Sequence, residues 1–231
     1  RSRGLGDVYK RQVSRFHAMS RSISGGPIYV SDTSDATNAT LLKSVACKDG
    51  TVLPCSDVGR PIKSMLLRDP FETKEPFVIF NTNGIPNGEV TSGVLGIFQL
   101  SGSGGLVTIR PSDVEAFRSS QYKETSFLAV SFPSRKAWML DSNSAQVDVS
   151  GEGQLWSDIV TFIPIKTRLL SPRDSDLFFD IVPLGITDKF NSAGAIIRSQ
   201  FAAVSSTMAR ARLSTRGCGQ FGFLFTLRNS K

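Results

Sequence analysis

Apolar residues recur at two different spacings along this chain, and the change of spacing divides it into two parts. From Val13 to about Ser24, three apolar residues recur three or four positions apart, namely Phe16, Met19 and Ile23. That spacing places them on one face, so it predicts an amphipathic helix. Gly25 and Gly26 follow directly, and glycine after a helix is the usual left-handed cap.

A short apolar run, Pro27–Val30, follows the glycines and ends at two polar residues, Ser31 and Asp32. An unbroken run of this length is typical of a parallel strand that is buried on both faces. A second helix is predicted after it, carrying Leu41, Leu42 and Val45 and capped by Ser34, Asp35 or Asn38. The first part therefore has the order helix, strand, helix.

The sequence pattern changes after Cys47. Residues 48–75 are rich in turn-forming pairs such as Asp49-Gly50 and Asp69-Pro70, so we interpret them as a connecting segment. From Pro76 onward short apolar runs alternate with turn signals, which is typical of an antiparallel β-sandwich, and only 112–117 and 186–191 indicate short helical turns. The runs are 77–81, 93–100, 106–111, 127–132, 136–140, 145–149, 159–165, 177–184, 194–201, 209–215 and 221–227.

The first twelve residues account for a large part of the net charge. Residues 1–12 are basic and resemble a non-native, adapter-like leader, so we expect them to lie outside the fold. Without them the chain has 23 bases and 19 acids, a net charge of +4. A charge of this size is common for solubility alone, so we expect no nucleic-acid partner. The longest apolar runs fall far short of the roughly 18 residues of a membrane span, so no membrane partner is expected.

The three cysteines, Cys47, Cys55 and Cys218, form no CxxC pair, and His17 is the only histidine. Neither a zinc site nor a disulfide framework is predicted, and we expect no metal or other cofactor. Free thiols favour a reducing compartment, which here means the cytoplasm. Cys218 is bracketed by glycines and is expected to be a buried structural thiol.

Several stretches resemble, in this order, the C-terminal part of raffinose synthases and of the related seed-imbibition and alkaline α-galactosidase proteins of glycoside hydrolase family 36. The resemblance runs from about Phe16 to Gly222. The stretches that carry it are "FHAMSRSISGGPIYVSD", "LLKSVACKDGTVLPC", "GVLGIFQLSG", "IRPSDVEAF", "PLGITDKFNSAGAI" and "RGCGQFG".

The resemblance implies a (β/α)8 barrel followed by a C-terminal antiparallel β-sandwich. Residues 13–47 would be the end of the barrel, 48–75 the connection and 76–231 the sandwich. Pro27–Val30 would be the last barrel strand, and active sites of such barrels lie at the C-terminal ends of the strands. Ser31 and Asp32 would then bind substrate. The alternative is that they hydrogen-bond the following turn, as Ser and Asp often do. The family usually continues with a Gly and a His-Asp pair, and this chain has "TSDATNAT" instead.

The resemblance also implies retaining chemistry on α-galactosides, which needs two carboxyl groups about 5 to 5.5 Å apart. In the family both are aspartates on earlier barrel strands, so no catalytic residue is carried over and a polypeptide of this sequence alone is expected to be inactive. The expected substrates are small carbohydrates: galactinol, sucrose and raffinose. Transfer of galactosyl from galactinol to sucrose is favoured. Hydrolysis by an α-galactosidase and a non-catalytic sugar-binding β-sandwich are the alternatives.

Three other groups have a structural and a functional interpretation. Asn81 and Asn83 are interpreted as structural residues of a strand end and turn rather than ligand contacts. Trp138 and Trp156 are expected to pack in or over the core rather than to stack on a sugar. The arginines of "MARARLSTRG", which are Arg210, Arg212 and Arg216, are expected to share one solvated strand face.

Overall fold

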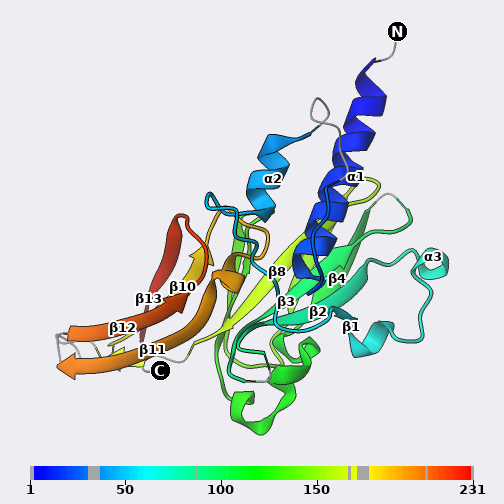
Figure 1. The fold of residues 1–231 in the computed structure, drawn as a ribbon. Coiled ribbons are helices and arrows are strands. Elements are labelled where there is room, and N and C mark those ends of the chain that lie inside the picture. The colour runs from blue at the N-terminus through cyan, green and yellow to red at the C-terminus, as the bar shows by residue number, and fades with distance from the viewer. Residues whose placement is uncertain are drawn as a thin grey trace.

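The computed structural model describes residues 3–30, 37–86, 88–102, 104–165, 168–170, 177–205 and 208–229. Three α-helices occur in these ranges: α1 (Arg3–Ile23), α2 (Ala39–Val45) and the single-turn α3 (Pro70–Thr73). Helices α1 and α2 lie side by side at one end of the molecule, α3 lies apart from them, and strands make up most of the rest (Figure 1). Five short 3-10 turns complete the described elements: Lys63–Met65, Pro111–Asp113, Glu115–Arg118, Ser120–Tyr122 and Ser192–Ala195.

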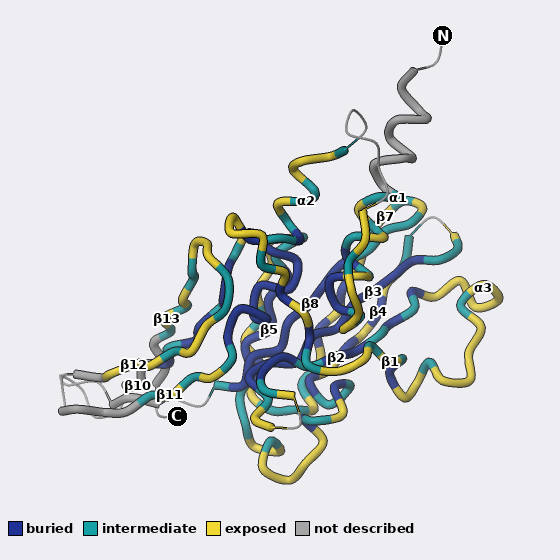
Figure 2. The backbone as a smooth tube through the Cα atoms, in the orientation of Figure 1, coloured by how far each residue is buried: buried dark blue, intermediate teal, exposed yellow. Residues whose placement is uncertain are grey.

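The largest sheet has six strands in the order β1-β2-β3-β8-β5-β6. Its strands β3, β8 and β5 are almost entirely buried, which explains their apolar character, and β2 is buried at five of its eight positions (Figure 2). All of its ladders are antiparallel. The strands are β1 (Arg60–Pro61), β2 (Phe77–Gly84), β3 (Val90–Phe98), β5 (Phe127–Ser131), β6 (Lys136–Leu140) and β8 (Ser157–Pro164).

Three smaller antiparallel sheets accompany it. Their orders are β13-β10-β9, β11-β12 and β4-β7. The strands are β4 (Gly104–Ile109), β7 (Val147–Glu152), β9 (Arg168–Leu170), β10 (Leu177–Ile186), β11 (Ile196–Ser205), β12 (Met208–Thr215) and β13 (Phe221–Asn229).

Helix α1 covers one face of the six-stranded sheet. Its Met19 and Ile23 are fully buried and pack against Val94, Phe98 and Ile159 of β3 and β8. The same face continues under the β10 sheet, where further apolar side chains join the two sheets into one cluster. The members of that cluster are Leu128, Val130, Ile163 and Val182.

The opposite face is covered by the β4-β7 ribbon and the 3-10 turn 115–118. Side chains of alternating strand positions point to this side, as the period of two in a strand requires. Phe117 is fully buried there against Phe127, with ring centroids 4.9 Å apart. Other members of this core are Val78, Phe80, Leu95, Ile97, Val107, Ile109, Val147, Val149, Val160 and Phe162.

The sequence predicted the strands well. Each of the eleven apolar runs overlaps one of the strands, and the predicted antiparallel pairing is confirmed throughout the described residues. The first helix begins at Arg3, earlier than expected, and ends at Ile23 before the glycines. The connecting segment contains three elements that were not predicted, β1, the 3-10 turn Lys63–Met65 and α3.

One prediction is wrong for the structure as it stands. Pro27–Val30 is not a strand, and Tyr29 and Val30 are 71% and 52% exposed instead of buried. A parallel strand exists only when neighbouring strands supply its hydrogen bonds. Every strand pairing found in the described part of the chain is antiparallel and none includes this segment.

Candidate functional site

A cleft lies between α1 and α2, beside the segment Pro27–Val30 that precedes the predicted substrate-binding residues. It has a volume of about 260 Å³. Helix α1 contributes Ser14, His17 and Arg21 to one wall. The other wall is apolar and consists of Ile28, Tyr29, Val30, Leu41, Leu42 and Val45.

Local sequence explains the geometry of the cleft. Gly25 has φ +77°, and a Cβ atom there would lie 1.9 Å from the Asp57 carbonyl oxygen, so only glycine fits. The chain therefore turns sharply after α1 and returns towards α2 along Pro27–Val30. Helix α2 starts at its predicted cap, because the Asn38 side chain accepts a hydrogen bond from the Leu41 amide at 3.0 Å.

Ser31 and Asp32, the predicted substrate-binding residues, lie outside the described residues, which stop at Val30 and resume at Thr37. Their contact with a sugar remains a prediction.

The described residues of the cleft offer few acid–base groups. His17 lies at its wall with its ring 5.9 Å from that of Phe16, and none of the lining residues that the structure describes is a carboxylate. In the part of the chain that the structure describes, no group of three or more His, Cys, Asp or Glu side chains is gathered that could hold a metal ion. What the arrangement offers is an apolar surface that can pack against further chain.

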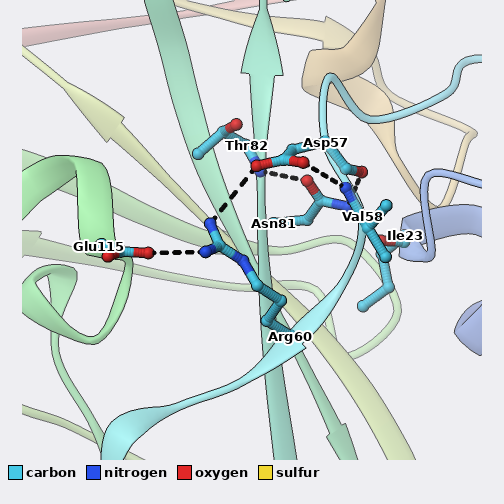
Figure 3. Close-up of polar contacts among 7 residues, drawn as sticks. All are labelled: Ile23, Asp57, Val58, Arg60, Asn81, Thr82 and Glu115. Atoms are coloured by element: carbon cyan, nitrogen blue, oxygen red, sulfur yellow. Dashed lines mark hydrogen bonds and ion pairs between the residues drawn. The ribbon is translucent and has the colours of Figure 1, made fainter. Parts of the chain in front are cut away.

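A polar clasp fastens the cleft to the sheet (Figure 3). The buried Asn81 side chain, on β2, donates from Nδ2 to the Ile23 carbonyl at 2.8 Å and to the Asp57 carbonyl at 2.6 Å. Its Oδ1 accepts from the Thr82 amide at 2.8 Å. The last residue of α1 is thereby tied to the central sheet and to the connecting segment.

Arg60 extends the clasp on β1. Its guanidinium pairs with Glu115 at 3.0 Å and with Asp57 at 3.4 Å, and it lies over the Phe80 ring at 5.0 Å. All three charged side chains are about half exposed. Such pairs contribute little to stability, and we assign Arg60 an orienting role for the connecting segment.

Asn83 and Asn191 form a second buried polar centre. Their side-chain amides bond each other at 3.0 Å, and Asn191 also donates to the Leu53 carbonyl at 2.9 Å. Asn83 donates to the Ser92 hydroxyl at 3.0 Å. Both predicted asparagines, Asn81 and Asn83, therefore have structural partners, which agrees with their structural interpretation.

The remaining predictions have mixed outcomes. Trp138 and Trp156 pack against the main core, as expected. Arg210 and Arg212 are exposed on β12, but Arg216 follows the end of that strand and is partly buried, so the shared face is wrong for it. Cys218 is exposed, so its prediction as a buried thiol is also wrong. Cys218 lies in the turn between β12 and β13, and connecting turns usually run over the protein surface, where water satisfies their backbone polar groups.

Taken together, the described residues define a protein of helices packed on mostly antiparallel sheets. The chain belongs to the family described as raffinose synthase or seed imbibition protein Sip1, whose model matches residues 8–157. No helix in the described ranges has both the length and the apolar character needed to cross a membrane.

Two relatives share most of this chain. A galactinol–sucrose galactosyltransferase from Pisum sativum is 30% identical over 228 residues, covering 90% of this chain and 27% of the relative. One of the same name from Oryza sativa subsp. japonica is 29% identical and covers 89% of this chain and 27% of the relative. The chain thus spans about a quarter of the length of the curated relatives it matches.

Among solved structures, α-galactosidase I from Mortierella vinacea is similar over 68% of this chain and 37% of its own, with a TM-score of 0.42 and 10% identity.

Proposed function

We propose that this chain is the C-terminal part of a galactosyl-transferring enzyme of the raffinose synthase type, which moves a galactosyl group from galactinol to sucrose. The observation that carries the proposal is family membership over residues 8–157, together with two relatives named for this transfer. The catalytic aspartates of the retaining mechanism would be supplied by earlier barrel strands of the parent protein, so the chain alone would be inactive.

Within this proposal, residues 13–47 complete the barrel and 76–231 form the C-terminal β-sandwich. Pro27–Val30 becomes the last barrel strand once neighbouring strands flank it. The exposed side chains of Tyr29 and Val30 and the apolar wall of the cleft support this, because large apolar groups gathered at a surface are typical of a packing interface. Helices α1 and α2 then lie on either side of the strand in the chain, as barrel helices do.

Ser31 and Asp32 would lie at the C-terminal end of that strand, facing the sugar. An ionised Asp32 could accept hydrogen bonds from sugar hydroxyls, and bonds to charged acceptors are the stronger ones. We place the parent protein in the cytoplasm, which fits the reduced state of Cys47, Cys55 and Cys218. Its partners would be small carbohydrates, with no cofactor.

The test compares two reactions of the longer parent protein, with the 231-residue chain as a control. Galactinol plus sucrose should yield raffinose, and the chain alone should yield none. Release of galactose from raffinose without transfer would replace the proposal with an α-galactosidase. Absence of both activities, with oligosaccharide binding retained by residues 76–231 in calorimetry, would favour a non-catalytic sugar-binding module.

A further inference from the structure

Two cysteines that are far apart in sequence meet at the junction between the helical part and the C-terminal strands. Cys47 follows α2 and belongs to a small buried core with Leu53, Ile186 and Ala195. Cys218 lies in the turn between β12 and β13. Their proximity is independent of the proposed transfer reaction.

The Cys218 turn lies against the Cys47 thiol. The backbone amide of Cys218 is close enough to that thiol to oppose the rise in its pKa. A Cβ atom placed on the neighbouring Gly217 would lie 2.7 Å from that sulfur and 3.5 Å from the Cys47 Cβ. The backbone of 217–218 is therefore packed against the thiol, and Gly217, with φ +75°, is what permits the approach.

Close packing of the two segments is the geometric basis for a bond between the two sulfurs. The Cys218 sulfur is three bonds from its own backbone amide, and rotation about the Cα–Cβ bond changes its position relative to Cys47. A disulfide needs Cα atoms about 4.4 to 6.8 Å apart, and the packing of 217–218 against the Cys47 sulfur brings the two residues close together. Hydrogen bonds hold both backbones in place. The Cys47 amide donates to the Thr51 carbonyl, and in the Cys218 turn the Arg216 amide donates to the Ala195 carbonyl.

The two thiols differ in access. Cys218 is exposed, whereas Cys47 is 6% exposed. Burial raises the pKa of Cys47, opposed by the Cys218 amide and by the nearby charge of Lys189. The exposed thiol is thus the first of the two to meet an oxidant.

We propose that Cys218 and Cys47 form a reversible, redox-sensitive disulfide, with a low-molecular-weight disulfide such as glutathione disulfide as oxidant. The Cys218 thiolate attacks the oxidant, forms a mixed disulfide and releases one glutathione thiolate. The Cys47 thiolate then attacks the Cys218 sulfur, forms the internal disulfide and expels the second glutathione. Two protein thiols are oxidised and one glutathione disulfide is reduced to two thiols. The product ties the end of α2 to the β12–β13 turn.

The experiment is thiol mapping of the full chain after treatment with glutathione disulfide. Free thiols are alkylated in denaturant and the protein is cut with trypsin. The three cysteines fall in separate peptides, which are Ser44–Lys48, Asp49–Lys63 and Gly217–Arg228. We expect a cross-link between the first and the third that dithiothreitol reverses.

Cys55 is the internal control. It is buried, and burial raises its pKa, so it should resist alkylation before denaturation and remain a thiol after oxidation. Cys218→Ser should abolish the cross-link and leave Cys47 as a free thiol, whereas Cys55→Ala should retain the cross-link.

Two results would overturn the proposal. One is a stable glutathione adduct on Cys218 with Cys47 still free for alkylation. The other is a disulfide that joins Cys55 to either of the other cysteines.

Discussion

The side-chain Nδ2 of Asn81 lies 2.8 Å from the carbonyl oxygen of Ile23, and this hydrogen bond joins the last residue of the first helix to the central sheet. The same amide binds the Asp57 carbonyl at 2.6 Å (Figure 3). Three separate parts of the chain therefore meet at one buried side chain. Together with the packing of Met19 and Ile23, it holds α1 on the sheet.

Replacing Asn81 with Ala should destabilise the chain by roughly 2 to 4 kcal/mol, because the substitution leaves buried carbonyl groups without donors. Urea denaturation followed by circular dichroism measures the change. Gln121→Ala is a matched control, since Gln121 is an exposed amide, and its effect should stay within about 0.5 kcal/mol. If the two substitutions changed the free energy of unfolding equally, the hydrogen bonds of Asn81 would contribute nothing to stability.

The approach of α1 to the sheet depends on Gly96. A Cβ atom there would lie 2.2 Å from Cδ1 of Ile23 and 2.6 Å from Cε2 of Phe98. Gly96→Ala should therefore cost roughly 1 to 3 kcal/mol by overpacking, measured by urea denaturation. Ile23→Val removes the clashing Cδ1 atom, so the double variant should lose less stability than the sum of the single ones.

Gly26→Ala is the control for the Gly96 substitution. A Cβ atom at Gly26 would meet only the Ser24 hydroxyl, at an ordinary 3.6 Å. The change should be neutral or slightly stabilising. Strict additivity of Gly96→Ala and Ile23→Val would contradict the close contact between the helix and the sheet.

Local patterns predicted much of this fold because strands and helices depend on spacing within one segment. The stripe of Phe16, Met19 and Ile23 and the apolar runs after Pro76 are of this kind. The segment Pro27–Val30 was predicted wrongly because strand formation needs partners elsewhere, and an apolar run carries no information about them.

The candidate site was harder to predict for the same reason. Asn81 binds a carbonyl 58 positions away, and no pattern near Asn81 shows this. The meeting of Cys47 and Cys218 depends on how the β12–β13 turn packs against the end of α2. The cysteine count could only show that a pair was available.

Asp113 gives the chain a pH dependence of defined sign. Burial raises its pKa, although hydrogen bonding to the Arg110 amide and the charges of Arg110 and Arg118 oppose the shift. The folded state thus holds the proton more tightly than the unfolded state. As pH rises from the ordinary carboxyl pKa through the raised one, this group's contribution to stability falls.

Asp113→Asn removes that titration and keeps an oxygen that can accept from the Arg110 amide, a bond of 2.8 Å in the structure. The free energy of unfolding of the variant, compared with that of the unsubstituted chain, should therefore increase from acidic to neutral pH. Urea denaturation at both pH values measures it. Asp141→Asn serves as the comparison at an exposed carboxylate. A difference that decreases with rising pH would mean that the Asp113 pKa is lowered instead.

Asp32 has two possible roles, to bind a sugar hydroxyl or to hydrogen-bond the turn that follows it, and a substitution distinguishes them. If its carboxylate accepts hydrogen bonds from a sugar hydroxyl, Asp32→Asn in the parent protein should raise KM by roughly 10- to 100-fold, the effect of losing a charge-assisted bond. Melting temperature should then stay unchanged. If Asp32 only bonds the following turn, the melting temperature should fall and KM should stay near that of the parent. Asp35 is a carboxylate further along the same segment, so Asp35→Asn is the control. An equal rise in KM for both variants would point to the net charge of the segment rather than to a contact made by Asp32.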